Sequence, residues 1–317
     1  MKIVVLDGFT LNPGDLSWDG LRELGDVTVY DRTSSQEIVE RSIDAEIILT
    51  NKTPITRETL ERLPHLRYIG VLATGYNIVD IQAAKEREII VTNIPDYSTY
   101  SVAQHTIALL LALFNQVQPH ADAVKQGNWT ASPDFCFTIA PLTELYGKTI
   151  GIFGHGLIGQ QVGRIAAALG LRVLCVSRKS SPATSLYGEA YVEIDKFLAE
   201  SDIISLHCPL TKDTEGFINR STIARMKNQA IVLNTSRGGL IVEQDLADAL
   251  FTGKIAGAGL DVLSTEPPRS DNPLIHAKNC IITPHVAWAS KEARSRLMTI
   301  CINNIQSYLQ GDTINSV

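Results

Sequence analysis

The chain has few cysteines, no excess of positive charge and no long apolar run, and each of these shortages excludes a class of protein. Its five cysteines are scattered through 317 residues without metal-ligand spacing, which argues against a disulfide framework or any metal site. The formal net charge of −6 does not provide the basic face that nucleic-acid binding needs. Apolar runs such as Ile107–Phe114 fall far short of the roughly 20 residues of a membrane span. We therefore expect a cytoplasmic protein that binds neither nucleic acid nor a membrane.

The composition is otherwise that of a globular protein, with 44% hydrophobic and 20% charged residues. A chain of 317 residues is long for one hydrophobic core, which favours two domains. The N-terminal segment Met1–Asp7 has no long apolar core of the signal-peptide kind and is typical of a first β-strand.

Short β-branched segments alternate with amphipathic, helix-like stretches along most of the chain. The first series of expected strands is Ile3–Leu6, Val27–Tyr30, Glu46–Thr50, Tyr68–Leu72 and Ile89–Asn93. The second series is Thr149–Phe153, Val173–Ser177, Ile203–His207, Ile231–Asn234, Gly257–Val262 and Ile281–Thr283. Strands that are continuously apolar are typical of parallel sheets covered by helices on both faces. The pattern predicts an α/β protein with two doubly wound parallel sheets.

The segments outside the two series indicate how the domains are divided. A long helix is expected over Ser101–Gln126, followed by an arm without clear period over Asn128–Leu145 that packs on another surface, such as a second subunit. The amphipathic stretch Lys291–Leu309 predicts a closing helix that returns to the first domain. We therefore expect one discontinuous domain, residues 1–99 and 287–317, and a second domain over residues 100–286.

A glycine loop follows the first strand of the second series. Gly154, Gly156 and Gly159 form a GxGxxG motif that lies between a strand and an amphipathic helix. The first glycine permits a tight turn, the second lets a pyrophosphate approach the backbone, and the third lets helix and strand pack closely. A purely structural turn is the alternative, but the strand and helix on either side of the motif favour dinucleotide binding.

The end of the next strand indicates which dinucleotide is bound. An acidic side chain at this position would hold the ribose hydroxyls of NAD, whereas this chain has Ser177 and Arg178 there. A serine hydroxyl can hydrogen-bond a 2′-phosphate and an arginine can pair with it. The sequence therefore favours NADP(H), with NAD(H) as the alternative if Arg178 is only a solvated loop charge.

Three polar residues follow strands of the second series, where an open α/β sheet places its ligand. They are Arg237, Glu266 and His285. A histidine can protonate a carbonyl oxygen near neutral pH, and a carboxylate on its other ring nitrogen holds the tautomer. Arginine suits a substrate carboxylate. Each residue alone is more often structural, but together they predict reduction of a 2-keto acid.

These residues lie in motifs that resemble the D-isomer-specific 2-hydroxyacid dehydrogenases over essentially the whole chain. The matching segments are Gly147-Lys148-Thr149, His207-Cys208-Pro209-Leu210-Thr211, Asn234-Thr235-Ser236-Arg237-Gly238-Gly239, Asp261-Val262, Glu266-Pro267 and Pro284-His285. The resemblance implies a Rossmann cofactor domain and a flavodoxin-like substrate domain with a cleft between them. It also implies a homodimer built around the arm.

The resemblance implies a role for each matching residue. Arg237 would orient and polarise the substrate, Glu266 and His285 would form the acid–base pair, and Asp261 would meet the nicotinamide carboxamide. The other expected cofactor contacts are Leu157, Ile158, His207, Cys208, Pro209, Thr214, Thr235 and Ser236. The related formate dehydrogenases have glutamine where this chain has Glu266, which argues against formate as substrate. Many family members have glutamate where this chain has Gln104, so the role of that acid is not carried over.

Candidate substrate contacts are less specific. Thr74 and Gly75 follow a strand and either form an anion nest for a carboxylate or are simply a tight turn. Lys52 lies in a loop that resembles that of glycerate dehydrogenases and hydroxypyruvate reductases, or is a surface lysine. Trp288 either walls the substrate pocket, favouring small side chains, or packs on the final helix.

The function expected from the sequence is NADP(H)-dependent reduction of a small-molecule 2-keto acid, hydroxypyruvate or glyoxylate. Two alternatives remain open at this point: a dehydrogenase of a phosphorylated 2-hydroxy acid, and a dinucleotide-sensing binding protein of the corepressor type.

Overall fold

The structure is a computed structural model that describes residues 1–176 and 186–317. The chain divides into two compact units, which we describe separately. The first unit comprises Met1–Ser98 and Ala289–Val317, and the second comprises Thr99–Trp288. The chain therefore passes from one unit to the other twice, after Ser98 and after Trp288. The sequence placed these boundaries at 99 and 287.

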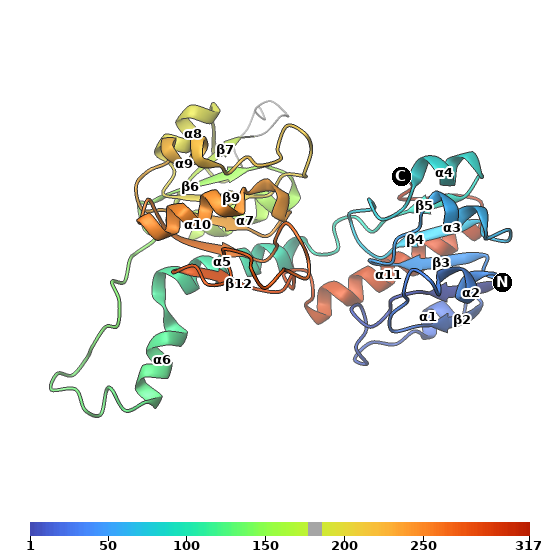
Figure 1. Ribbon diagram of the computed structural model, residues 1–317, viewed down its shortest axis with the longest axis horizontal. Coiled ribbons are helices and arrows are strands. Elements are labelled where there is room, and N and C mark those ends of the chain that lie inside the picture. Colours follow the sequence, from blue (N-terminus) through green and yellow to red (C-terminus); the bar gives the residue numbers. More distant parts are fainter. Residues whose placement is uncertain (177–185) are drawn as a thin grey trace. The chain divides into compact units, whose positions relative to one another are not determined.

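The first unit is built on a parallel sheet in the order β2-β1-β3-β4-β5 (Figure 1). Its strands are β1 (Lys2–Val5), β2 (Asp26–Val29), β3 (Ile47–Thr50), β4 (Tyr68–Val71) and β5 (Ile90–Thr92). Its helices are α1 (Asp19–Arg22), α2 (Ile38–Ser42), α3 (Arg57–Glu61), α4 (Ile81–Glu86) and α11 (Lys291–Leu309). Residues of α2, α3 and α4 bury their apolar side chains with those of the sheet in one core. This strand order is that of the flavodoxin-like doubly wound fold.

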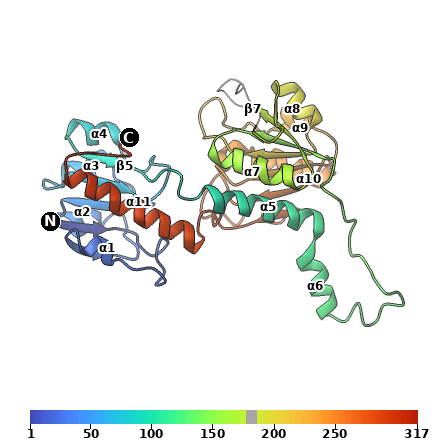
Figure 2. The ribbon, with the colours of Figure 1, turned by 180° about the vertical axis from the view of Figure 1, so that it is seen from behind.

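Helix α11 packs against this sheet, although its sequence lies almost 200 residues after β5 (Figure 2). Ser290 caps its N-terminus by accepting a hydrogen bond from the Ala293 N–H. The Tyr308 ring lies 4.8 Å from that of Tyr68 in β4. After the helix, the Val317 N–H donates to the Val91 carbonyl of β5 at 3.0 Å. The C-terminal segment is thus part of the first unit.

The second unit is built on a larger parallel sheet. Among the described residues it has seven strands in the order β12-β11-β10-β9-β6-β7-β8. These are β6 (Thr149–Phe153), β7 (Arg172–Val176), β8 (Ala190–Tyr191), β9 (Ile203–Leu206), β10 (Ala230–Asn234), β11 (Ile255–Leu260) and β12 (Cys280–Ile282). Its helical elements are α5 (Thr99–Asn115), α6 (Val117–Lys125), α7 (Leu157–Ala168), α8 (Ile194–Glu200), α9 (Arg220–Arg225), η1 (Gly238–Leu240) and α10 (Glu243–Thr252).

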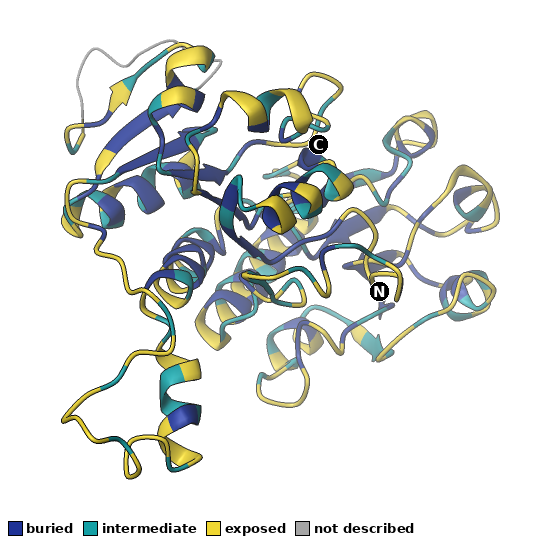
Figure 3. Cartoon of the chain, turned by 60° about the vertical axis from the view of Figure 1, so that its left-hand side comes forward, coloured by how far each residue is buried: buried dark blue, intermediate teal, exposed yellow. Residues whose placement is uncertain are grey.

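Helices cover both faces of the larger sheet, so its central strands β6, β9 and β10 are largely buried on both sides (Figure 3). Leu110 of α5 and Val162 of α7 belong to the core on one face. Phe197, Ile223 and Leu246, from α8, α9 and α10, belong to the core on the other face. The predicted fold of two doubly wound parallel sheets is confirmed.

The predicted helix Ser101–Gln126 is wrong in one respect, because the structure breaks it into α5 and α6. The break is at Gln116, whose φ of 47° is left-handed. Pro119 explains the position of the break. In a continuous helix its ring would clash with the Asn115 carbonyl, whereas in the first turn of a new helix a proline is tolerated. The break turns α6 away from the body of the second unit (Figure 1).

Two further expectations concern the cysteines and the length of the apolar helices. All five cysteines are free. Within residues 1–176 and 186–317, no helix is both long and apolar enough to cross a membrane.

Candidate active site

The polar residues singled out in the sequence gather at one edge of the larger sheet. Its strands are all parallel, so the residues that directly follow them lie at the same edge. The glycine loop follows β6, His207 follows β9, Thr235 follows β10, Asp261 follows β11 and Thr283 follows β12. Residues that lie far apart in the sequence are thereby brought into one row of loops.

The geometry of the glycine loop fits a bound dinucleotide pyrophosphate. Gly154 has φ 98°, and a Cβ added there would lie 2.6 Å from the Cys208 nitrogen, so only glycine fits. A Cβ on Gly159 would lie 2.2 Å from the Gly154 carbonyl oxygen. Gly156 is the N-cap of α7, and a Cβ added there would meet no heavy atom within 4 Å. The loop is therefore closed on its protein side and open at the helix N-terminus, where the backbone N–H groups of Leu157 and Ile158 have no acceptor within the helix.

His155, between the first two glycines, points into the protein and is buried. Its Nδ1 lies 2.6 Å from the Tyr191 hydroxyl and its Nε2 lies 2.5 Å from the Tyr187 hydroxyl. Burial lowers the pKa of His155, while the Glu189 carboxylate opposes this effect. A neutral imidazole can satisfy both tyrosines, since one nitrogen donates and the other accepts. These two contacts anchor the glycine loop to the protein interior, and the sequence did not predict them.

Glu266 and His285 meet, although 19 residues separate them. The Nδ1 atom of His285 lies 2.6 Å from Glu266 Oε2, and the other carboxylate oxygen accepts the Leu263 N–H at 3.1 Å. A carboxylate so close to Nδ1 accepts a hydrogen bond from that nitrogen, which fixes the tautomer and the orientation of the ring. The Nε2 atom is then the position from which a proton can be donated to a ligand.

The backbone at His285 adopts the left-handed region, with φ 53°. This conformation is unfavourable for a side chain with a Cβ, and the neighbouring contacts must hold it. The His285 N–H donates to the main-chain carbonyl of Asp261 at 2.8 Å. The Asp261 carboxylate accepts the N–H groups of Val286 at 2.9 Å and Ala287 at 2.8 Å. Asp261 thus holds three consecutive N–H groups of the turn that carries His285.

Arg237 lies in the loop after β10. Asn234 shapes this loop, since its amide donates to the Arg237 carbonyl at 2.9 Å and its oxygen accepts the Ser236 N–H at 3.0 Å. The Arg237 guanidinium donates to the Ser236 carbonyl at 2.8 Å and is exposed. One nitrogen therefore orients the side chain, and the rest of the planar fork remains accessible for a carboxylate.

The other predicted cofactor contacts lie in the neighbouring loops, where their side chains tie these loops together. Ser236 Oγ donates to the Cys208 carbonyl at 2.7 Å, which joins the loops after β9 and β10. Thr214 Oγ1 donates to the Pro209 carbonyl at 2.8 Å. The Thr235 hydroxyl lies 2.8 Å from that of Thr106 in α5. Ser177 and Arg178 lie outside the described residues.

The predicted substrate contacts of the first unit lie in loops that are anchored within that unit. The Asp7 carboxylate accepts the backbone N–H groups of Asn51, Lys52 and Thr53 at 2.8, 2.5 and 2.8 Å, and the Lys52 side chain is exposed. The Thr74 hydroxyl donates to the Ile94 carbonyl at 2.9 Å. Trp288, in the second unit, is half-buried directly after the turn that carries His285. Substrate binding by Lys52, Thr74, Gly75 and Trp288 stays a prediction.

Sequence reasoning missed the side chains that support the site from behind, such as Ser101, His105 and Thr283. The only signal that could have suggested the first two was their spacing of four residues in an otherwise apolar helix. Their partners lie almost 200 residues away, so no local pattern identifies the contacts.

Comparison with known proteins gives the family. Residues 107–287 match the sequence profile "D-isomer specific 2-hydroxyacid dehydrogenase, NAD binding domain". The chain belongs to this family. It is 55% identical to a hydroxypyruvate reductase of Blautia hydrogenotrophica, over 100% of this chain and 99% of that one. It is 41% identical to a glycerate dehydrogenase of Methylorubrum extorquens, over 91% and 90% of the two chains.

A solved structure of an acyclic imino acid reductase in complex with NADPH and D-Arg has the same fold. It is 35% identical, with a TM-score of 0.86 and complete coverage of both chains. The chain is therefore an oxidoreductase of the D-2-hydroxyacid dehydrogenase family with a nicotinamide dinucleotide cofactor. The resemblance drawn from the sequence motifs is confirmed.

The titration of His207, which directly follows β9, predicts that the protein becomes less stable at acidic pH. Burial lowers the pKa of His207 from 6.5 to about 3, and its Nε2 lies 2.7 Å from the Ser205 hydroxyl. The folded state therefore binds fewer protons than the unfolded state between pH 6.5 and about 3, so this contribution to stability is present above pH 6.5 and lost as the pH falls. We expect the free energy of unfolding to decrease by up to about 1.4 kcal/mol per pH unit in this range because of His207.

Urea unfolding at a series of pH values measures this slope. The variant His207→Gln retains a hydrogen-bonding group but does not titrate, so its free energy of unfolding should fall less steeply. Equal slopes for the wild-type chain and the variant would show that His207 is not the source.

Proposed function

We propose that the chain reduces hydroxypyruvate or glyoxylate, to D-glycerate or glycolate, with NADP(H) as the preferred cofactor and NAD(H) as the alternative. The observation that carries this proposal is the 2.6 Å contact between His285 and Glu266, at the sheet edge that also bears Arg237 and the glycine loop. A proton donor, a carboxylate-binding cation and a dinucleotide site together are what reduction of a 2-keto acid requires.

His285 is the proton donor in this proposal. Its Nε2–H would protonate the substrate's carbonyl oxygen while the bound nicotinamide supplies the hydride to the carbonyl carbon. The ring becomes neutral in this step and retains its proton on Nδ1, where Glu266 accepts the hydrogen bond. Because the Leu263 N–H holds the other oxygen of Glu266, the carboxylate does not have to reorient during the transfer.

Arg237 is the cation that orients the substrate. Its guanidinium is fixed by its own hydrogen bond to Ser236 and can pair with the substrate carboxylate through its remaining N–H groups. The same charge polarises the adjacent carbonyl and favours the oxygen that becomes negative as the hydride arrives. Lys52, Thr74, Gly75 and Trp288 are proposed to complete substrate binding.

The N-terminus of α7 is the proposed seat of the pyrophosphate, held by the N–H groups of Leu157 and Ile158. The residues His207, Cys208, Pro209, Thr214, Thr235, Ser236 and Asp261 would line the dinucleotide along the same edge. The preference for NADP(H) rests on the chemistry of Ser177 and Arg178, which suits a 2′-phosphate and offers no carboxylate to ribose hydroxyls. The NADPH bound to the related imino acid reductase is consistent with this preference.

The proposed substrate is small, as in the most similar relatives described above. The hydroxypyruvate reductase at 55% identity spans the full length of this chain, which supports the same substrate here. The presence of Glu266 beside His285 argues against the corepressor alternative, since a binding protein needs no acid–base pair.

We also propose a homodimer that is built around the arm between α6 and β6. This arm exposes several large apolar side chains to solvent within the second unit. They include Trp129, Phe135, Leu142 and Tyr146, with exposed fractions of 52, 89, 52 and 82%. So much exposed apolar surface on one projecting segment is typical of a subunit interface.

Removing the proton donor tests the assignment of His285. The variant His285→Gln should lower kcat by about 3 to 4 orders of magnitude, because it removes general acid catalysis and the imidazolium charge together. The dissociation constant of NADPH, measured by fluorescence, should change less than about twofold. Loss of NADPH binding in this variant would instead mark His285 as a structural residue.

A panel of 2-keto acids tests the substrate and the cofactor together. Hydroxypyruvate, glyoxylate, pyruvate and 3-phosphohydroxypyruvate are each assayed with NADPH and NADH by the absorbance at 340 nm. We expect kcat/KM to be highest for hydroxypyruvate or glyoxylate with NADPH. A preference for the phosphorylated acid would establish the alternative dehydrogenase, and no oxidation of either cofactor would revive the corepressor function.

A further pair of substitutions tests the cofactor preference by changing only the residues proposed to bind the adenosine 2′-phosphate. Combining Arg178→Ala with Ser177→Asp should move the ratio of kcat/KM values for NADPH and NADH toward NADH by about 10-fold or more, since a carboxylate repels the 2′-phosphate. An unchanged ratio would refute the role of these two residues.

Sedimentation measures the proposed dimer. The mass measured by sedimentation equilibrium should be twice the 34.6 kDa of one chain. Replacing Phe135 and Leu142 by serine should shift it to the monomer, because the apolar area buried at the interface is lost. Phe251 of α10 is 90% exposed and lies outside the arm, so Phe251→Ser is the control that should remain dimeric. A monomeric wild-type chain would contradict the proposal.

A further inference from the structure

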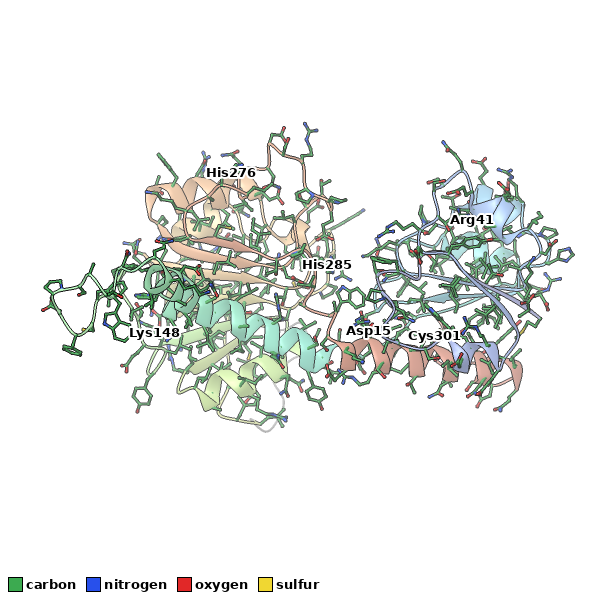
Figure 4. The ribbon with its side chains drawn as sticks, turned by 90° about the horizontal axis from the view of Figure 1, so that it is seen from below. Asp15, Arg41, Lys148, His276, His285 and Cys301 are labelled. Carbon is green, nitrogen blue, oxygen red and sulfur yellow. The ribbon has the colours of Figure 1, made fainter. Side chains whose placement is uncertain are left out.

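The first turns of α5 carry two polar side chains on one face of a helix that is otherwise largely apolar. Ser101 and His105 are four residues apart, so they lie one above the other on the same side. Neither has a place in the proposed chemistry. Both nevertheless contact the 283–287 turn, which carries His285 (labelled in Figure 4).

The two contacts hold the turn at its two ends. Ser101 Oγ donates to the Ala287 carbonyl at 2.6 Å. His105 Nε2 lies 2.9 Å from Thr283 Oγ1 and 3.5 Å from Asp261 Oδ1. His285 is halfway between these two attachment points, in its left-handed conformation.

The hydroxyl of Thr283 fixes the direction of the hydrogen bond from His105. Thr283 Oγ1 lies 2.6 Å from Asp261 Oδ1, and an ionised carboxylate can only accept. The single hydroxyl hydrogen is therefore directed at Asp261, and the Thr283 oxygen must accept from His105. His105 thus carries a proton on Nε2, and a chain of donors runs from His105 through Thr283 to Asp261.

This chain ends on the group that orders the turn. Asp261 is 1% exposed, and its carboxylate holds the N–H groups of Val286 and Ala287. Without the donor from His105, the Thr283 hydroxyl is less polarised and its hydrogen bond to Asp261 weakens. Asp261 Oδ1 also loses the imidazole Nε2–H group, whose nitrogen lies 3.5 Å away. A buried carboxylate with fewer donors moves or binds water, and the N–H groups it holds move with it.

We propose that His105 is a positioning residue for His285, acting through Thr283 and Asp261, and that Ser101 fixes the other end of the same turn. The inference rests on the proposed function of His285 as proton donor. A shift of His285 by about 1 Å would slow proton transfer strongly, because general acid catalysis requires hydrogen-bond distance to the carbonyl oxygen. The glycine loop follows a different strand, β6, so the pyrophosphate site should be unaffected.

Three variants on one helix test the proposal. His105→Leu removes the donor, His105→Gln retains an N–H at a similar reach, and Gln104→Ala changes an exposed neighbour on the same helix. Single-turnover hydride transfer and its solvent deuterium isotope effect are measured with the 2-keto acid that the wild-type enzyme reduces best.

We expect His105→Leu to slow hydride transfer by about 10-fold or more and to raise the solvent isotope effect, since proton transfer becomes more limiting. The NADPH dissociation constant should rise by a smaller factor than the rate falls, because the proposed pyrophosphate site follows β6 and does not involve Asp261. His105→Gln should recover most of the rate, and Gln104→Ala should equal the wild-type enzyme. A wild-type rate and isotope effect in His105→Leu would overturn the proposal, as would an equal loss in His105→Gln.

A second measurement does not depend on turnover. The imidazole nitrogen signals of His285, identified by their loss in His285→Gln, are recorded by NMR in each variant. They should shift in His105→Leu and remain in place in Gln104→Ala; unchanged signals in His105→Leu would refute the positioning role even if no keto acid proves to be a substrate. If His105→Leu does not fold, Ser101→Ala gives the same comparison at the other end of the turn, with a smaller shift expected.

Discussion

The buried carboxylate of Asp261 is the constraint on which the proposed active site depends. A charge that is 1% exposed persists only if several donors surround it. The chain supplies them from the Thr283 hydroxyl and the N–H groups of Val286 and Ala287. To meet these donors, the segment after β12 must turn sharply, and the unfavourable φ of His285 is the result. The turn that provides hydrogen-bond donors to the Asp261 carboxylate therefore also directs the His285 imidazole toward Glu266.

The arrangement also follows from the topology of a parallel sheet. Each strand of the second unit ends at the same edge, so one polar residue placed after each strand is enough to assemble a site from distant segments. The loops are then fastened to one another and to α5, as Ser236 is to Cys208 and Thr235 is to Thr106. Helix α5 contributes most to this fastening, since its side chains reach the loops after both β10 and β12.

Local patterns predicted the strands well. A strand of a parallel sheet that is covered on both faces needs apolar side chains at nearly every position, and such a run is visible in the sequence. These patterns placed β6 at its observed bounds and missed β8, whose two residues are too few to form a pattern. The helix break at Gln116 was missed because the helix was predicted from the apolar spacing over Ser101–Gln126, and the helix-breaking effect of Pro119 was not taken into account. Motifs identified Glu266 and His285, but not the roles of His105 or His155. Those roles depend on the distances to Thr283 and to Tyr187 and Tyr191, which only the folded chain sets.

The division of the first unit between two ends of the chain has a consequence for the order of folding. Helix α11 and the residues that pair with β5 follow the whole of the second unit in sequence. During synthesis on the ribosome, Met1–Ser98 emerges first with the sheet face beneath α11 uncovered, and Tyr68 of that face has no Tyr308 to pack against. By the time α11 is synthesised, the whole of the second unit has been made, so its core can form before that of the first unit is complete. The unit that begins to emerge first is therefore completed last.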